Sequence, residues 1–356
     1  MSQTAIIAER LAKLDLPARF AALKDKKILV TGAAGFLGGA LFRRLAAYGC
    51  DVTGTVLYPA EAEALRKEGF RAKVLDLASD EPFARFVEGM DIVFNVAAMF
   101  RETEHGEALY TKVNRDGALK LCQAAAAAGV ERFVHCSTVG VHGDVKEIPC
   151  KETTPYNPTN HYTRAKLKGE LAILEFGRSL PPNGMVVTAN RPGICYGPGD
   201  TRMLILFKNV LKNRFVIIGK GDVFCHLDYV DDQTNTFLLC AVAPRENVHG
   251  EAFNIASGEA VKVNTLIRTI ADQGGVKLSR LRIPARPIWL LGWACELIFM
   301  PLGLKPPLFR RRVGFFMENR IFDLTKAKER LGYVSEWNYP EGIARTIDWY
   351  RANKMV

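Results

Sequence analysis

The chain has 356 residues, which is long for one hydrophobic core, so a large domain and a smaller one are expected. Hydrophobic residues make up 48% and charged residues 24%, which is ordinary for a globular protein. The net charge of +10 favours anionic partners such as a phosphorylated cofactor or anionic lipid, whereas the absence of a nucleic-acid-binding motif or basic repeat predicts no nucleic-acid partner.

Residues 2–24 carry apolar residues at positions 6, 7, 11, 14 and 20 with charges between, which predicts an amphipathic helix at the edge of the first domain, with membrane contact as the alternative. Glu9, Lys13 and Asp15 interrupt any apolar run, so no signal peptide and a cytoplasmic protein are expected. The eight cysteines form no C-x-x-C pair. They are expected to be buried thiols, with no disulfide framework and no metal site.

The stretch Lys27–Ala40 reads KILVTGAAGFLGGA and predicts a buried strand, a glycine turn and the start of a helix at Phe36. Its glycines stand at 32, 35 and 38. Such a turn lets the backbone approach a pyrophosphate and presents N–H groups at a helix N-terminus. A dinucleotide site is therefore predicted here.

Further strands alternate with helices along the first 190 residues, and a helix carries Asn114. This alternation indicates a doubly wound parallel sheet of the α/β class. The predicted elements are strands at Asp51–Leu57, Ala72–Leu77, Asp91–Ala98 and Arg132–Thr138 and a helix at Tyr110–Ala128.

The choice between NAD and NADP stays open in the sequence, with a slight lean to NADP. Near the end of the second strand stand Val56, Leu57 and Tyr58, neither the acidic residue typical of NAD sites nor the arginine typical of NADP sites. Arg43 and Arg44 are candidates for a 2′-phosphate contact, with ordinary surface residues as the alternative. Asp76, at the end of the third strand, is a candidate acceptor for the adenine amino group or else a turn cap.

Tyr162 and Lys166 stand four residues apart in HYTRAKLKGE, a predicted helix, so both side chains lie on one helix face. A tyrosine with a pKa of about 10 is a poor acid–base group at neutral pH, and a neighbouring ammonium stabilises its phenolate. The pair is a candidate proton-transfer centre, just after a strand that ends at Ser137 and Thr138. An ordinary surface pair is the alternative.

Together these stretches resemble the extended short-chain dehydrogenases/reductases, the NAD-dependent epimerase/dehydratase superfamily. They run in family order over about residues 25–260: TGAAGFLG (31–38), LDL (75–77), NVAA (95–98), VNRDGA (113–118), STVGVHG (137–143), YTRAK (162–166), RPGICYGPGD (191–200) and HLDYVDD (226–232). The resemblance implies a Rossmann-type fold and NAD(P)(H) as cofactor.

The resemblance also implies roles for single residues. Tyr162 would be the proton donor, and Lys166 would hold the ribose and tune the tyrosine. Asp76 would contact adenine, and Pro192 to Ile194 would cover the nicotinamide amide. The implied cofactor contacts are Gly32, Gly35, Phe36, Leu37, Gly38, Asp76, Leu77, Ala97, Asn114, Ser137, Tyr162, Lys166, Pro192 and Ile194.

In the family, the catalytic Ser or Thr lies four residues before the tyrosine of a V-Y-G motif. Here that motif reads Val141-His142-Gly143, so the matching residue is Thr138, and Ser137 is expected to contact the cofactor. His142 replaces the tyrosine, so the resemblance does not predict how the wall of the substrate pocket is built.

Two departures count against a nucleotide-sugar substrate. Enzymes of that kind often carry an arginine that grips the diphosphate in an R-x-F-x-H-V-D-D stretch, and that position is Cys225 here. A thiol cannot replace a guanidinium. The dehydratases also place acidic residues just after the Ser/Thr, where this chain has Val139 and Gly140.

The segment Pro287–Leu304 is apolar except for Glu296, which with Pro301 argues against a spanning helix. It contains two tryptophans and resembles the 3β-hydroxysteroid dehydrogenase-like branch, whose members act on sterols and other membrane lipids. An interfacial helix on anionic lipid is predicted, with a buried core helix as the alternative. Basic residues flank the segment, namely Arg280, Arg282, Arg286, Lys305 and Arg310–Arg312.

The expected architecture is a Rossmann-type doubly wound parallel sheet with a smaller C-terminal substrate part. The predicted divisions are a helical extension (1–24), a dinucleotide-binding domain (25–190, joined by 225–255), and a substrate part (191–224 and 256–356) with a membrane-facing segment (287–316).

The expected function is NAD(P)-dependent interconversion of a secondary alcohol and a ketone on a hydrophobic lipid-like substrate, such as a sterol or a sphingoid lipid. Peripheral membrane association is expected, and a homodimer is left open. The alternatives are a nucleotide-sugar epimerase or dehydratase, a small-molecule ketone reductase, and a dinucleotide-binding sensor or scaffold. The intact Thr138, Tyr162 and Lys166 argue against the scaffold.

Overall fold

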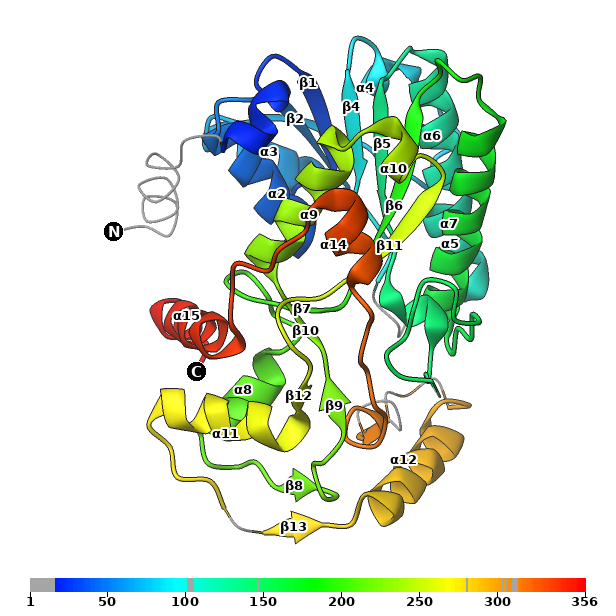
Figure 1. The fold of residues 1–356 in the computed structure, drawn as a ribbon. Coiled ribbons are helices and arrows are strands. Elements are labelled where there is room, and N and C mark those ends of the chain that lie inside the picture. Colours follow the sequence, from blue (N-terminus) through cyan, green and yellow to red (C-terminus); the bar gives the residue numbers. More distant parts are fainter. Residues whose placement is uncertain are drawn as a thin grey trace.

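The computed structural model describes the chain except residues 1–16, 101–105, 146, 280, 303, 305 and 309–312. At its centre is a seven-stranded parallel sheet in the order β11-β6-β5-β4-β1-β2-β3 (Figure 1). The predicted doubly wound sheet is thereby confirmed. Its strands are β1 (Lys27–Thr31), β2 (Asp51–Val56), β3 (Arg71–Val74), β4 (Ile92–Asn95), β5 (Arg132–Cys136), β6 (Val186–Pro192) and β11 (Glu251–Ile255).

Helices cover both faces of the sheet, because successive strand residues point to opposite sides. Ile28 and Val30 of β1 belong to one core, and Leu29 belongs to the other. The first face is covered by α2 (Phe36–Ala47), α3 (Pro59–Lys67), α9 (Val230–Val242), α10 (Arg245–Val248) and α14 (Thr325–Leu331). The second is covered by α4 (Ala84–Val87), α5 (Glu107–Thr111), α6 (Ala118–Ala127) and α7 (His161–Ser179).

β2, β3, β4 and β5 all end earlier than the sequence predicts, and for β3 and β4 the contacts at the strand end give the reason. β3 ends at Val74, and the Asp76 carboxylate then accepts a hydrogen bond from the Ala78 N–H at 2.8 Å, which closes a turn. β4 ends at Asn95, because the Thr31 hydroxyl oxygen accepts the N–H groups of the next two residues instead of leaving them to a strand ladder.

The predicted helix at 110–128 is interrupted. It consists of α5, a π-helical stretch η2 (Lys112–Gly117) and α6. Asn114 lies inside η2 and is buried. Short π-helical stretches inside α-helices often occur at functional sites.

Of the predicted N-terminal helix, residues 2–16 lie outside the described residues. The first described element is a short 3-10 helix, η1 (Ala18–Leu23), whose Phe20 and Leu23 side chains are buried. η1 packs against α9, so this part of the chain lies at the edge of the sheet domain.

The remainder of the chain lies below the sheet in Figure 1 and has its own apolar core. β7 (Ile194–Tyr196) pairs there with β10 (Leu227–Tyr229). Three helices surround this core, namely α8 (Leu204–Leu211), α11 (Val263–Gly274) and α15 (Tyr339–Ala352). The short strands are β8 (Ile217–Ile218), β9 (Phe224–Cys225), β12 (Val261–Lys262) and β13 (Arg282–Ile283).

The apolar segment near residue 290 forms α12 (Ala285–Phe299) at the outer edge of this lower part (Figure 1). Only Gly292 of this helix is buried, so the alternative of a buried core helix is wrong. None of the helices in the described residues is long and apolar enough to cross a membrane. The flanking Arg280, Lys305 and Arg310–Arg312 lie outside the described residues.

Candidate active site

The glycine turn joins β1 to α2 and has the shape that a pyrophosphate requires. Gly32 has a φ of +71°, in the left-handed region that favours glycine, and a Cβ there would lie 3.0 Å from the Cα of Ala97. A Cβ at Gly38 would collide with the carbonyl oxygen of Gly32. Gly35 is exposed and begins α2 without a side-chain cap, so the first-turn N–H groups at Phe36 and Leu37 have no competing side-chain acceptor from their N-cap.

A buried chain of polar groups connects this turn to Lys166. Thr31 Oγ1 accepts the N–H groups of Val96 and Ala97 at 3.0 and 2.9 Å, so its own hydrogen is donated to Asn95 Oδ1 at 3.0 Å. The Asn95 amide nitrogen then donates to His135 Nδ1 at 3.1 Å. The ring hydrogen of His135 must therefore lie on Nε2.

His135 Nε2 lies 3.4 Å from the Lys166 Nζ, which also donates to the Cys136 carbonyl oxygen. Lys166 is almost fully buried, and burial lowers the pKa of its ammonium group. Because His135 presents a hydrogen to Lys166, it offers the lysine no acceptor. The ribose hydroxyls of a bound dinucleotide would supply acceptors at this nitrogen.

Tyr162 lies in the first turn of α7, and a capping box fixes where that helix begins. The Asn160 side chain accepts from the Thr163 N–H at 2.9 Å, and the Thr163 hydroxyl oxygen accepts from the Asn160 N–H at 3.2 Å. The Phe100 ring packs edge-on against the Tyr162 ring, with 4.9 Å between centroids. Burial raises the pKa of Tyr162, and the charge of Arg202 lowers it in part. The phenol is thereby held in its proton-donating form.

Ser137 and Thr138 follow β5 and differ in what their hydroxyls contact. Thr138 Oγ1 accepts the Gly140 N–H at 3.1 Å as the N-cap of η3 (Val139–His142), so its O–H hydrogen can be donated to another oxygen. Ser137 Oγ is buried without a hydrogen-bond partner among the described residues. A buried unpaired hydroxyl is costly, which indicates a ligand at this position.

Three predicted cofactor residues have structural contacts of their own. Asn114 holds the loop after β4, since its side chain accepts from the Met99 N–H at 2.8 Å and donates to the Met99 carbonyl oxygen at 3.0 Å. Asp76 caps its own turn, which is the alternative that the sequence offered to an adenine contact. The Leu77 side chain is buried, and its carbonyl lies so close to Gly117 that no Cβ would fit there.

The segment predicted to cover the nicotinamide, Pro192 to Ile194, is anchored by a residue that the sequence interpretation missed. Asp228 Oδ2 accepts from the Gly193 N–H at 3.3 Å and from the Cys195 thiol at 3.2 Å. Asp228 is completely buried, and burial raises its pKa to about 7. An acidic residue inside the apolar strand of HLDYVDD was the available signal.

His142 is buried beneath the site and does not form an exposed wall. Its Nε2 lies 3.0 Å from a guanidinium nitrogen of Arg191, and its ring stacks on Tyr156. Arg191 also forms a buried ion pair with Glu170 at 2.5 Å. Burial first, and then the charge of Arg191, lower the pKa of His142 to about 4.

Both arginines proposed for a 2′-phosphate contact have other partners in the structure. Arg43 pairs with Glu68 at 2.9 Å. Arg44 donates to the Asp231 carbonyl oxygen and to the Thr234 hydroxyl of α9. The lean to NADP therefore stays a prediction without support from these two residues.

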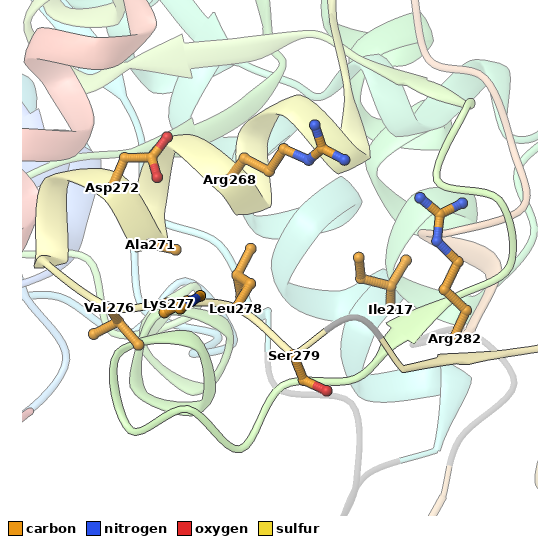
Figure 2. A pocket seen from close by; sticks show the side chains of 9 residues that line it. All are labelled: Ile217, Arg268, Ala271, Asp272, Val276, Lys277, Leu278, Ser279 and Arg282. Atoms are coloured by element: carbon orange, nitrogen blue, oxygen red, sulfur yellow. The ribbon is translucent and has the colours of Figure 1, made fainter.

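A surface hollow of about 620 Å³ lies in the lower part of the molecule, between α11 and the β8–β13 pair (Figure 2). Arg268, Lys277 and Arg282 line it together with Asp272. Figure 2 shows the two guanidinium groups on neighbouring sides of the hollow. None of Thr138, Tyr162 or Lys166 lines it, so it is separate from the candidate active site.

The residues present fit a dinucleotide. The glycine turn has no room for side chains at Gly32 and Gly38. The unpaired Ser137 hydroxyl follows β5, at the edge of the sheet where the carboxyl ends of β1 and β5 lie.

Seven of the eight cysteines are buried and all are free. No cluster of metal-ligating side chains occurs in the described part of the chain.

The comparisons with known proteins agree with this arrangement. The NAD dependent epimerase/dehydratase family matches residues 28–256. The chain is 29% identical to 3beta-hydroxysteroid-dehydrogenase/decarboxylase isoform 1 of Arabidopsis thaliana, over 91% of this chain and 79% of that one. It is 28% identical to a 3-beta-hydroxysteroid dehydrogenase of Mycolicibacterium neoaurum, over 91% of each. It is 27% identical to 2-alkyl-3-oxoalkanoate reductase of Shewanella oneidensis, over 91% and 86%.

Solved structures share the fold. UDP-glucose 4-epimerase of Thermotoga maritima, with UDP-glucose, is 26% identical with a TM-score of 0.71, over 92% of this chain and 99% of that one. A dTDP-glucose 4,6-dehydratase of Streptomyces venezuelae with NAD bound is 23% identical with a TM-score of 0.70, over 92% and 98%. This chain belongs to the NAD-dependent epimerase/dehydratase family of extended short-chain dehydrogenases/reductases, and is an NAD-dependent oxidoreductase of that type.

Proposed function

We propose that this enzyme interconverts a secondary alcohol and a ketone on a hydrophobic, lipid-like substrate. The observation that carries the proposal is the exposed apolar face of α12, in a chain that also has the Thr138, Tyr162 and Lys166 set. The relatives named as hydroxysteroid dehydrogenases and as an oxoalkanoate reductase support an alcohol–ketone reaction. The site assignments are part of this proposal.

In the reducing direction, Tyr162 gives its phenolic hydrogen to the substrate oxygen while Thr138 donates a hydrogen bond to the same oxygen. The dinucleotide held at the glycine turn and by Lys166 would supply the hydride that the carbonyl carbon accepts. Lys166 holds the ribose and sits on the same helix face as Tyr162, where a positive charge lowers the energy of the phenolate. In the oxidising direction, Tyr162 takes the hydroxyl proton back.

A nucleotide-sugar substrate is the second candidate, because the structural neighbours include enzymes solved with UDP-glucose. Its diphosphate would need a cation at the position of Cys225. That residue is completely buried in β9, and its thiol carries no charge, since burial raises its pKa to about 12. The favoured substrate is therefore the hydrophobic one.

The exposed face of α12 is proposed to rest on an anionic membrane surface. Six apolar side chains of the helix and its C-terminal end are exposed, namely Leu290, Leu291, Trp293, Leu297, Ile298 and Met300. The exposed Arg282 and Arg286 lie directly before them, and the hollow of Figure 2 adds Arg268 and Lys277. Apolar surface beside basic groups suits the boundary between acyl chains and acidic headgroups.

The proposed function is tested with the purified chain, each dinucleotide in turn, and a small set of substrates. A steroid ketone and a long-chain methyl 3-oxo ester represent hydrophobic ketones, and UDP-glucose represents nucleotide sugars. We expect dinucleotide oxidation with at least one hydrophobic ketone and no conversion of UDP-glucose. Epimerisation of UDP-glucose without turnover of either ketone would contradict the proposal. If a hydrophobic ketone is reduced, lipid analysis of cells lacking the protein would identify the alcohol or ketone that accumulates.

A further inference from the structure

The hollow between α11 and the β8–β13 pair has the size of a small-molecule site (Figure 2). Its volume of about 620 Å³ falls within the range of about 300–1,000 Å³ that ligand pockets occupy. Basic side chains reach it from separate elements, Arg268 from α11 and Arg282 from β13. The apolar part of its lining consists of Ile217, Ala271, Val276 and Leu278.

The charge of this lining is unbalanced. Arg268, Lys277 and Arg282 stand against one carboxylate, that of Asp272, so the lining has a net charge of +2. Asp272 lies one turn after Arg268 in α11, yet the structure shows no ion pair between them. In the described part of the chain, the side chains of Arg268 and Lys277 have no hydrogen-bond partner, and Arg282 has one, the Lys220 carbonyl oxygen at 3.4 Å. The hollow therefore presents several unused donors to an anion.

The hollow also adjoins the exposed apolar helix α12. The Gly219 N–H, just after β8, donates to the Ile283 carbonyl oxygen of β13 at 2.8 Å, and α12 begins two residues later at Ala285. Leu281 and Ile283, on either side of Arg282, are exposed apolar side chains. A ligand in the hollow thus has apolar surface next to its anionic group.

We propose that the hollow binds the phosphate monoester headgroup of a membrane lipid, as phosphatidic acid carries. This inference rests on the membrane docking of α12 in the proposed function and adds the headgroup that the docked protein selects. A phosphate monoester carries about −1.5 to −2 charges at neutral pH, which matches the lining. The phosphodiester of a lipid such as phosphatidylserine carries less charge. Guanidinium groups suit phosphate, because each can pair with two of its oxygens.

The neighbouring apolar surface favours a lipid over a soluble phosphate ester. The acyl chains of a lipid held in the hollow would lie toward α12, whereas a soluble ester would leave that surface in water. Because the hollow is separate from the candidate active site, this lipid is a docking ligand and not the substrate. The phosphates of the dinucleotide are a third source of this chemistry, so every measurement is made with saturating dinucleotide.

The test is flotation of the full chain with phosphatidylcholine vesicles that contain either phosphatidic acid or phosphatidylserine, prepared to the same surface potential. We expect wild type to bind the phosphatidic acid vesicles about 10-fold more tightly, because the additional phosphate charge is met by two arginines. Arg282→Met should bring that preference close to one. Arg268→Met, which changes the opposite element, should do the same.

Arg286→Met is the matched control. Arg286 is also an exposed arginine, four residues after Arg282, but it does not line the hollow. Both variants lose one positive charge and a similar share of the general attraction to an acidic surface. Only Arg282→Met should lose the preference for phosphatidic acid. Equal binding of both vesicles by wild type, or a preference that survives in Arg282→Met and Arg268→Met, would overturn the headgroup site and leave membrane docking through α12 standing.

Calorimetry with dihexanoyl phosphatidic acid, below its micellar concentration, decides the case in which wild type binds neither vesicle. That result would count against the membrane docking in the proposed function. Binding that Arg282→Met weakens about 10-fold, and Arg286→Met does not, would still support the headgroup site. Absence of binding would overturn it. Equal affinity for glycerol 3-phosphate would also overturn it, since the ligand would then be a soluble phosphate ester.

Discussion

At the scale of single residues, the site depends on side chains that hold other side chains. Thr31, Asn95 and His135 form an ordered series of hydrogen bonds, and Nε2 of His135 then lies 3.4 Å from Nζ of Lys166. Each position is completely buried, so removing one member would leave its neighbours unpaired. This makes the strand ends after β1, β4 and β5 part of the proposed reaction centre as well as of the sheet.

His142 predicts how stability depends on pH. Its pKa of about 4 in the folded chain lies below the ordinary value of about 6.5. Above pH 6.5 neither the folded nor the unfolded chain protonates this ring, so its contribution is fully present. As pH falls from about 6.5 to about 4, the unfolded chain takes up a proton that the folded chain does not, and stability falls by about 3 kcal/mol; below that, no more is lost.

Chemical denaturation at several pH values checks this prediction. His142→Gln keeps an acceptor for Arg191 but does not titrate, so its free energy of unfolding should fall less than that of wild type between pH 6.5 and 4. The other histidines contribute equally to both proteins. Parallel curves for the two would show that His142 is not the group responsible.

At the scale of elements, the start of α7 determines where Tyr162 stands. Asn160 caps α7, and Asn338 caps α15 in the same way, accepting from the Glu341 N–H at 3.0 Å. Replacing either by alanine should cost about 0.5–2 kcal/mol of stability. Only Asn160→Ala should also lower kcat, because only α7 carries Tyr162, the proposed proton donor.

The pair Asn160→Ala and Asn338→Ala separates stability from positioning. Thermal unfolding should shift by similar amounts in the two variants, while steady-state kinetics should differ. An equal loss of kcat in both, or no loss in Asn160→Ala, would mean that this cap does not position Tyr162.

Much of the fold was predictable from the sequence because local signals agreed with the global arrangement. The glycine spacing at 32, 35 and 38 and the alternation of strands and helices predicted the sheet correctly. The π-helical turn at Asn114 was not predictable, because it depends on the close approach of Gly169 in α7 to the Asn114 carbonyl oxygen. Side-chain partners such as His135 and Asp228 were missed. Each is a single polar residue in a mostly apolar strand, and the strand was interpreted only as part of the core.

At the scale of the whole molecule, α12 gives the protein an exposed apolar edge far from the sheet (Figure 1). A soluble monomer seldom exposes such a contiguous apolar surface without a partner. Positive charge at Arg282, Arg286 and the neighbouring hollow would draw this edge to acidic headgroups. A hydrophobic substrate could then reach the enzyme without crossing water.

Flotation with anionic vesicles tests this prediction. Wild type should float with the vesicles at low salt and partly remain bound at high salt, since each buried Leu or Ile adds about 1.5–3 kcal/mol that salt does not screen. Leu297→Ser with Ile298→Ser should abolish binding, whereas Leu171→Ser with Val334→Ser, at other exposed positions, should not. Wild type that stays in the soluble fraction would refute membrane docking.

The most direct test of the central claim is the turnover of Tyr162→Phe beside its affinity for dinucleotide. If Tyr162 transfers the proton, kcat on a hydrophobic ketone should fall about 10²- to 10⁴-fold, because that is the usual contribution of a general acid. The dissociation constant for dinucleotide should stay close to that of wild type, since the ring and its contact with Phe100 remain. A Tyr162→Phe variant that turns over at nearly the wild-type rate would contradict the assignment of this enzyme's reaction centre.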